Sequence, residues 1–234
     1  MDLIKTNNFF YNIVQETSKL STCYRVKVWA IIVQNWRIIS SWYNWTPSKI
    51  LECQEYKKIL SSVYNWITKW SLNTQEDIID YIKQQVLVVD KKYEDNKELL
   101  KFIAEETQKY FNKSYLKELK EQIKIAEDWS STLKKKIKDD FIYRNNLFHS
   151  SNSILWEVHA EQNALLFASK AWISVNWCDL YCNYLPCATC AKLIKQAWIE
   201  NVYYISEYSK DWQKSTDFFK INWIWLKKLR LIEE

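Results

Sequence analysis

Glycine is absent from this chain of 234 residues, and proline occurs at only 2 positions. An average usage of about 7% would give roughly 16 glycines in a chain of this length. Because glycine alone adopts positive φ without a steric cost, a folded chain of this size is expected to need some of them. The sequence instead contains 14 tryptophans, a number close to that of the missing glycines. The positions of the tryptophans therefore need an explanation.

Several tryptophans stand in sequence contexts that are typical of glycine. Trp36 follows an asparagine between two apolar runs, where a two-residue hairpin turn favours Asn-Gly, and Trp177 repeats this pattern. Trp172 and Trp198 each follow an amphipathic segment, at the position where glycine commonly ends a helix. We interpret this pattern as UGA recoding, in which UGA codons that mean glycine were read as tryptophan. UGG codons at the 14 positions would contradict this hypothesis.

Other features that the sequence lacks narrow the class of protein. No run approaches the ~20 apolar residues of a membrane-spanning helix, and we recognise no secretory signal. The net charge of +5 is too small to indicate nucleic-acid binding by itself. The 6 cysteines, without a secretory signal, favour metal binding or catalysis over disulfides. We expect a cytoplasmic protein that does not bind membranes.

Two patterns of composition divide the chain. Residues 54–148 are rich in Lys, Glu, Asp and Ile/Leu at helical spacing, and their balanced charge indicates solvated helix faces. Residues 1–53 predict a helix, two strands at 27–33 and 37–43, and a polar loop, whereas the chain from residue 158 onward alternates helices and strands. This alternation favours an α/β layered sandwich on a mixed five-stranded sheet, mostly parallel after an opening hairpin. We therefore predict one core, 1–53 with 149–234, that carries a large helical insertion.

The strongest chemical signal is a pair of short motifs, His159-x-Glu161 and Pro186-Cys187-x-x-Cys190. One histidine and two cysteines supply three zinc ligands and leave the fourth position open for water, as in catalytic zinc sites. The two cysteines lie three residues apart at the start of a predicted helix, whose positive end favours thiolates. Glu161 lies on the same helical turn as the histidine and can move protons. A closed structural zinc or a CxxC redox pair are the alternatives, but the combined motifs match the signature of zinc nucleobase deaminases.

The segments HAEQNALLFASKAW, NWCDLY and PCATCAKLIKQAWI resemble the CMP/dCMP deaminase family. When tryptophan is read as glycine, STCYRVKVWAIIVQNWRIISSWYNWTPS resembles the N-terminal segment of the same family. The resemblance covers about 1–53 and 149–225. It implies a three-layer α/β/α cytidine-deaminase-like fold, a catalytic zinc on the histidine and the two cysteines, and hydrolytic deamination of dCMP to dUMP with Glu161 as proton shuttle. It also implies glycine at Trp29, Trp42, Trp45, Trp172, Trp177, Trp198 and Trp223.

The resemblance also implies residues that contact the substrate. Asn44 matches the family asparagine that contacts the sugar, and a turn-forming asparagine bonded to its own backbone is the alternative. Arg25 and Lys27 precede the first strand and could bind the 5′-phosphate, which suits the guanidinium fork, although a solvated surface pair explains them equally well. Backbone groups around Ala160 and Leu185 are expected to hold the edge of the pyrimidine.

Four further residues suggest a second metal site. Cys23, Cys53, His149 and Glu157 are scattered in the sequence, but the order of the motifs is expected to bring them to one edge of the sheet. Such a set would close a tetrahedral structural zinc, and its spacings resemble those of phage-type members of the family, which carry a second zinc. Two buried free cysteines and a surface histidine are the alternative. We predict one catalytic zinc and a second, structural one.

Two other function classes remain open from the sequence. A nucleic-acid deaminase such as a tRNA adenosine deaminase shares the zinc core, but the modest charge argues against it. A catalytically silent deaminase fold could act as an interaction protein through the insertion, but the intact histidine, glutamate and cysteines argue against that. The family resemblance further implies a homo-oligomer that responds to dCTP and dTTP and that feeds thymidylate synthesis.

Overall fold

The computed structural model describes residues 3–23, 25–46, 157–207 and 212–230, helix α4 and individual positions elsewhere between 47 and 156. The chain forms two compact units, Met1–Trp45 with Glu157–Glu234 and Thr46–Trp156. In the second unit, α4 (Lys97–Tyr110) lies within residues 54–148, whose apolar side chains recur at helical spacing. Leu99 is buried, and Glu98 and Lys109 lie at the helix ends that favour their charges. No helix in the described parts of the chain is long and apolar enough to cross a membrane.

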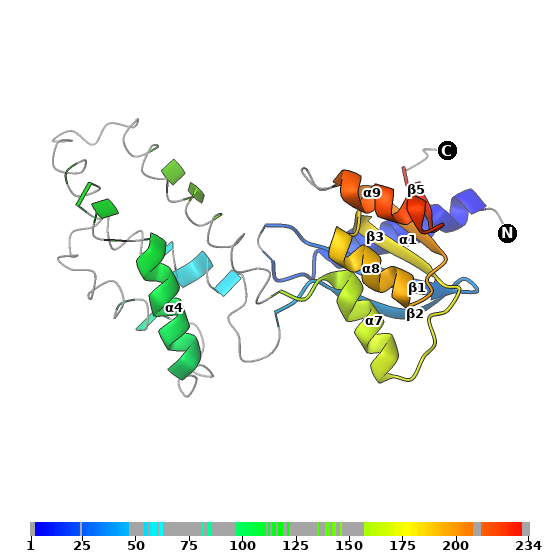
Figure 1. Ribbon diagram of the computed structural model, residues 1–234, viewed down its shortest axis with the longest axis horizontal. Coiled ribbons are helices and arrows are strands. Elements are labelled where there is room, and N and C mark those ends of the chain that lie inside the picture. The colour runs from blue at the N-terminus through cyan, green and yellow to red at the C-terminus, as the bar shows by residue number, and fades with distance from the viewer. Residues whose placement is uncertain are drawn as a thin grey trace. The chain divides into compact units, whose positions relative to one another are not determined.

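The first unit contains a five-stranded sheet of mixed direction (Figure 1). Its order is β2-β1-β3-β4-β5; β1 is antiparallel to both β2 and β3, whereas β3, β4 and β5 run parallel. The strands are β1 (Trp29–Gln34), β2 (Arg37–Tyr43), β3 (Asp179–Tyr184), β4 (Asn201–Ser206) and β5 (Trp225–Lys228). The mixed five-stranded sheet is as predicted, although β1 starts two residues later than expected, at Trp29.

Helices cover both faces of this sheet and give the predicted three layers. Helices α7, α8 and α9 lie side by side and pack on one face, and α1 packs on the other (Figure 1). Alternation along β1 explains both cores, because Ile32 faces α7 and α8 while Ile31 faces α1. The helices are α1 (Leu3–Ser18), α7 (Ala160–Lys170), α8 (Ala188–Gln196) and α9 (Trp212–Ile221).

Tryptophans occupy backbone conformations that favour glycine. Among the described residues, six have positive φ, and five of them are tryptophans. Asn35 and Trp36 have φ of 48° and 67°, which fits the two central residues of a type I′ hairpin turn between β1 and β2. The others are Trp172, Trp177, Trp198 and Trp223, with φ between 58° and 61°. For a bulky side chain this left-handed region is strained, because Cβ approaches the carbonyl oxygen.

Three helices end in the same hydrogen-bonding motif with a tryptophan at its left-handed position. After α7, the amide of Trp172 donates to Ser169 at 3.0 Å and the next amide donates to Ala168 at 2.9 Å. The same pair of bonds follows α8 at Trp198 and α9 at Trp223. This is the Schellman arrangement, in which glycine is the usual residue. The predicted cap positions of Trp172 and Trp198 are therefore confirmed.

Two tryptophans in the hairpin, the buried Trp29 and the half-buried Trp42, bury the N–H end of the indole ring. Trp29 and Trp42 each bury Nε1 with no hydrogen-bond partner in the described part of the chain. The ring of Trp42 also stacks on Phe167 with centroids 3.9 Å apart, closer than the ~4.5–7 Å usual for aromatic pairs. A buried indole N–H without a partner costs stability. Neither side chain fits its surroundings well.

Candidate metal centre

The two motifs meet where the N-termini of α7 and α8 adjoin. His159 is the N-cap residue of α7, Cys187 is the N-cap residue of α8, and Cys190 lies in the first turn of α8. The His159 Nδ1 atom lies 3.6 Å from the Cys187 sulfur and 3.4 Å from the Cys190 sulfur. The three potential ligand atoms all lie within 4.8 Å of one another. The expected His-Cys-Cys cluster is thus assembled by the fold.

The donor set and its spacing fit zinc. In tetrahedral sites the Zn–S and Zn–N bonds are about 2.3 and 2.0 Å, which separates a nitrogen from a sulfur by about 3.5 Å. The two N–S distances, 3.6 and 3.4 Å, agree with this value. Cys190 is fully buried, whereas His159 and Cys187 are half-buried and so partly accessible to solvent. Three ligands with one open side are the arrangement of a catalytic metal site.

Local hydrogen bonds hold the histidine in place. The side-chain oxygen of Gln162 accepts a hydrogen bond from the His159 amide at 3.0 Å, as in a capping box. The side-chain amide of Asn163 donates to the carbonyls of Tyr43, at 3.0 Å, and Val158, at 3.3 Å. Asn163 thereby ties the start of α7 to the end of β2. No sequence pattern points to Asn163, because a buried asparagine inside a helix has no periodic signal.

Hydrogen bonds among the three side chains shift the pKa of each. A hydrogen bond from the Cys190 thiol lowers the pKa of Cys187 to about 4, although burial opposes this shift. The side-chain hydrogen bond with Cys187 raises the pKa of His159 to about 9. The pKa of Cys190 is raised, because its thiol donates to Cys187 and because it is buried. The three side chains thus share protons that a dication would displace, leaving a neutral imidazole and two thiolates.

Glu161 lies beside the cluster in the first turn of α7. Its side chain is 4% exposed. Burial raises the pKa of its carboxyl group, and the positive charge of His159 opposes the shift. A carboxyl group whose pKa is raised holds its proton more readily, which suits a group that both accepts and donates a proton in general acid–base catalysis. Cys182, on β3, is a neighbouring thiol whose pKa burial raises well above its usual range, as expected for a core cysteine.

Asn44 lies at the centre of a hydrogen-bond network at the end of β2. Its side-chain oxygen accepts from the Val28 amide at 2.9 Å and from the Ser21 hydroxyl at 2.6 Å. Its side-chain nitrogen donates to the Val26 carbonyl at 3.0 Å and to a Glu157 carboxylate oxygen at 3.3 Å. These contacts use the two acceptor and two donor sites of the amide. Asn44 therefore joins the chain before β1 to the residues before α7, and it does not bond its own backbone.

The other two predicted pyrimidine contacts lie next to the ligands. Ala160 is fully buried at the start of α7, directly after His159. Leu185 precedes the Pro186-Cys187 step, and its amide donates to the Ser206 carbonyl at 2.8 Å. The backbone group that Leu185 could offer a ligand is therefore its carbonyl.

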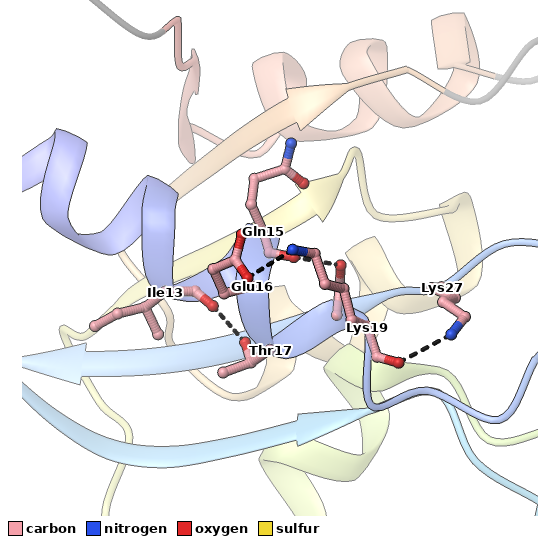
Figure 2. A network of polar contacts seen from close by, with 7 residues as sticks. Ile13, Gln15, Glu16, Thr17, Lys19 and Lys27 are labelled. Atoms are coloured by element: carbon pink, nitrogen blue, oxygen red, sulfur yellow. Dashed lines mark hydrogen bonds and ion pairs between the residues drawn. The ribbon is translucent and has the colours of Figure 1, made fainter.

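Arg25 and Lys27, the predicted phosphate contacts, are exposed residues on the segment that leads into β1. The Lys27 ammonium donates to the carbonyl of Lys19 at 2.9 Å, just beyond the end of α1 (Figure 2). The Lys19 side chain in turn pairs with Glu16 at 2.6 Å (Figure 2). A lysine near the last carbonyls of a helix is stabilising. Because an ammonium has three donors, this contact leaves Lys27 further hydrogen-bonding capacity.

The predicted second metal set falls only partly within the described residues. Cys23 is 2% exposed, and Glu157 is half-buried and bonded to Asn44. Cys53 and His149 lie outside the described residues. Within the described part of the chain, the His159 cluster is the group of three or more such side chains close enough to hold a metal.

A cavity of about 650 Å³ lies elsewhere, on the outer side of α7 and α8. Leu165, Leu166, Leu193 and Ile173 give it a mainly apolar lining. Neither the three clustered ligands nor Glu161 line this cavity. The cavity is therefore separate from the metal centre.

Comparison with known proteins gives the class of this domain. Residues 112–206 match the family described as the cytidine and deoxycytidylate deaminase zinc-binding region. The match contains His159, Glu161, Cys187 and Cys190, and it begins within the segment predicted as an insertion. This part of the chain is therefore similar to the zinc-binding region of cytidine and deoxycytidylate deaminases, and it lies within an α/β fold.

Individual relatives agree with this assignment. The deoxycytidylate deaminase of Enterobacteria phage T2 is 26% identical over 194 residues, which cover 83% of this chain and 76% of the phage protein. ComE operon protein 2 of Bacillus subtilis is 41% identical over 51 residues, 22% of this chain and 27% of that protein. The crystal structure of dCMP deaminase from cyanophage S-TIM5 in complex with dCMP and dUMP has a TM-score of 0.50 at 20% identity, covering 98% of this chain and 99% of that chain. This last likeness shows a common fold.

Proposed function

We propose that this protein catalyses the hydrolytic deamination of dCMP to dUMP. The observation that carries the proposal is the buried Glu161 beside the His159, Cys187 and Cys190 cluster, two residues along the chain from the first ligand. The names of the phage relatives support dCMP as the substrate. We assign the product to thymidylate supply and place the reaction in the cytoplasm.

In this proposal His159, Cys187 and Cys190 hold one catalytic zinc, and Glu161 is the catalytic acid and base. The zinc, when bound, supplies Lewis-acid activation of the water that attacks C4. Glu161 would take one proton from that water and deliver it to N3, and it would then move the second proton, from the hydroxyl group now on C4, to the leaving amino group. The C4–O bond forms, the C4–N bond breaks, and ammonia leaves with dUMP as the other product. Burial of Glu161 favours its protonated form, which supports delivery of the proton in the second half of the reaction.

The substrate contacts are proposed on the residues around the metal centre. Asn44 contacts the sugar, and its longest hydrogen bond, 3.3 Å to Glu157, is the one that a sugar hydroxyl would replace. The Ala160 backbone and the Leu185 carbonyl hold the pyrimidine edge. Arg25 and Lys27 bind the 5′-phosphate, which their exposed positions on one segment would allow.

We also propose that the natural chain carries glycine at its tryptophan positions. Among the residues that the structure describes, five of these positions have positive φ, and two others, Trp29 and Trp42, bury an indole N–H that has no partner there. The rings of Trp172 and Trp223 are 96% and 94% exposed, so hardly any packing offsets the backbone strain there. The codons of the gene and peptide mass spectrometry of the protein from its native source test this point directly. Tryptophan masses or UGG codons at the positive-φ positions would overturn it.

A second, structural zinc on Cys23, Cys53, His149 and Glu157 is a further part of the proposal. It is supported by Asn44, which hydrogen-bonds both Glu157 and Ser21, two residues before Cys23. A buried cysteine and a carboxylate thus approach the same network. Replacing Cys53 with serine and counting zinc per chain tests this site, and an unchanged count would exclude it.

We propose a homo-oligomer that dCTP and dTTP regulate, as the family resemblance implies. The segment 54–148 is the proposed source of oligomer contacts. Deletion of about 57–145 followed by mass measurement in solution tests this role. An unchanged oligomer after the deletion would assign the contacts to the core.

The decisive experiment is an assay of ammonia release with the chain that carries glycine at all 14 tryptophan positions. The substrates are dCMP, CMP, dCTP, single-stranded DNA and tRNA, and Glu161→Gln is the matched control. We expect turnover of dCMP that the control abolishes. Turnover of nucleic acid alone would establish a nucleic-acid deaminase instead. A zinc-loaded, folded chain without activity on any substrate would refute the proposed reaction.

A further inference from the structure

Ser215 of α9 is a buried hydroxyl that contacts the turn before a metal ligand. Its side chain is 1% exposed, and its Oγ donates a hydrogen bond to the carbonyl oxygen of Pro186. Ser215 is far from Pro186 in the sequence, but α9 packs against α8 and brings the hydroxyl to this turn. The residue belongs to neither deaminase motif.

In the turn from β3 into α8, a backbone group of each of three successive residues forms a hydrogen bond. The Leu185 amide donates to the Ser206 carbonyl at 2.8 Å, and the Pro186 carbonyl accepts from Ser215. The Cys187 carbonyl accepts from the Ala191 amide at 2.8 Å. Of these three bonds, only the one at Pro186 comes from a side chain. It can therefore be removed without changing the backbone.

The Pro186 carbonyl has a direct geometric link to the ligand sulfur. It lies in the same planar peptide unit as the Cys187 nitrogen, so that fixing the carbonyl direction fixes the plane from which the Cys187 side chain starts. Cys187 has an extended conformation, with φ of −67° and ψ of 167°, and its sulfur accepts from the Cys190 amide at 3.5 Å. Rotation of the Pro186–Cys187 peptide would move the sulfur relative to both His159 and Cys190.

We infer that Ser215 is a positioning residue that holds Cys187 in ligand geometry through the Pro186 peptide. This inference rests on the proposed metal site of His159, Cys187 and Cys190. Residues that orient metal ligands from outside the coordination sphere typically contribute about 10–100-fold to metal affinity. The Ser215 hydroxyl thereby links the packing of α9, a helix that carries none of the three proposed ligands, to the metal site.

The test compares Ser215→Ala with Ser40→Ala in the full chain, both as printed and with glycine at the tryptophan positions. Ser40 is a matched control, because it is also buried and its Oγ also donates to a backbone carbonyl, that of Ala164, at 2.6 Å. The two variants lose equivalent buried hydrogen bonds, but only one of these bonds reaches the ligand turn. Thr216→Ala, next to Ser215 on α9, controls for the change in helix composition, because Thr216 is only half-buried and its hydroxyl donates to the Trp212 carbonyl within the same helix.

Two readouts separate positioning from general stability. Zinc affinity is measured by competition with a chromophoric chelator, and ligand geometry is measured by the d–d absorption bands of the cobalt-substituted chain, both below the unfolding transition of every variant. We expect Ser215→Ala to bind zinc at least about tenfold more weakly and to alter the cobalt bands. Ser40→Ala and Thr216→Ala should keep the parental affinity and spectrum, whatever their effect on the unfolding temperature.

The possible results distinguish this inference from the proposed function. If the parent binds zinc and Ser215→Ala keeps the parental affinity and cobalt spectrum, the inference is wrong and the metal site stands. If Ser215→Ala and Ser40→Ala weaken zinc binding equally, the effect is one of stability alone and the inference is again wrong. A parent chain that binds no zinc would refute the proposed metal site and the inference with it.

Discussion

Replacing Trp172 by glycine should stabilise the protein, whereas replacing it by alanine should not. Trp172 has φ of 58° at the end of α7, and its ring is 96% exposed. Removal of the ring therefore loses almost no buried surface in either variant. Alanine keeps the Cβ atom that crowds the carbonyl in the left-handed region, and glycine removes it.

The size of the effect follows from two opposing contributions. The left-handed conformation costs a residue with Cβ about 1–2 kcal/mol. Part of this gain is lost, because the unfolded chain has more conformational freedom with glycine than with alanine at residue 172. This difference lowers the free energy of unfolding of the glycine variant by about 0.4–1 kcal/mol. The free energy of unfolding of the glycine variant should therefore exceed that of the alanine variant by about 1 kcal/mol. For a protein of this size such a difference raises Tm by about 2–4 °C.

The assay is urea and thermal unfolding of three chains that differ only at residue 172, with glycine at every other tryptophan position. Tryptophan and alanine at this residue should give similar Tm values, and glycine should give a higher one. Trp223, with φ of 59° and 94% exposure after α9, offers an independent repeat whose effect should add to the first. Equal stability of the glycine and alanine variants at both positions would show that the left-handed conformation is not the reason for the glycine-like pattern.

Three further predictions concern the metal centre. Glu161→Gln should lower the rate of ammonia release from dCMP by at least about 10²-fold at unchanged zinc content, and a rate within tenfold of the parent would exclude Glu161 as the proton shuttle. Removal of zinc with a chelator should abolish activity and lower Tm, because a ligand present at 1,000 times its Kd stabilises the folded state by about 4 kcal/mol. Added zinc should restore both the activity and the Tm, and a failure to restore them would contradict this prediction. Asn163→Ala should cost about 1–3 kcal/mol in urea unfolding, because the Tyr43 carbonyl loses its side-chain donor, and an unchanged midpoint would contradict this role of Asn163.

The sequence by itself determined the chemistry and the class of fold. The motifs around His159 and Cys187 contain histidine and cysteine at a spacing that suits zinc. Whether a residue can bind zinc depends on its side-chain type, which the sequence gives directly. The alternation of strands and helices predicted the mixed sheet, because side-chain periodicity depends on the local backbone alone. The glycine-like positions of Trp36, Trp172, Trp177 and Trp198 were also visible, since turns and helix ends are specified by a few neighbouring residues.

Only the tertiary structure decided how these local elements support one another. The tertiary structure places Asn44, which the sequence predicted to contact the sugar, at the centre of a network that uses all four hydrogen-bonding sites of its side chain. It brought Asn163 to the carbonyl of Tyr43, and Ser215 to that of Pro186. These partners are distant in the sequence, and a buried carbonyl can be satisfied by any donor that the packing of helices brings within reach. For this reason no local pattern reveals them, whereas the ligands that they support could be read directly.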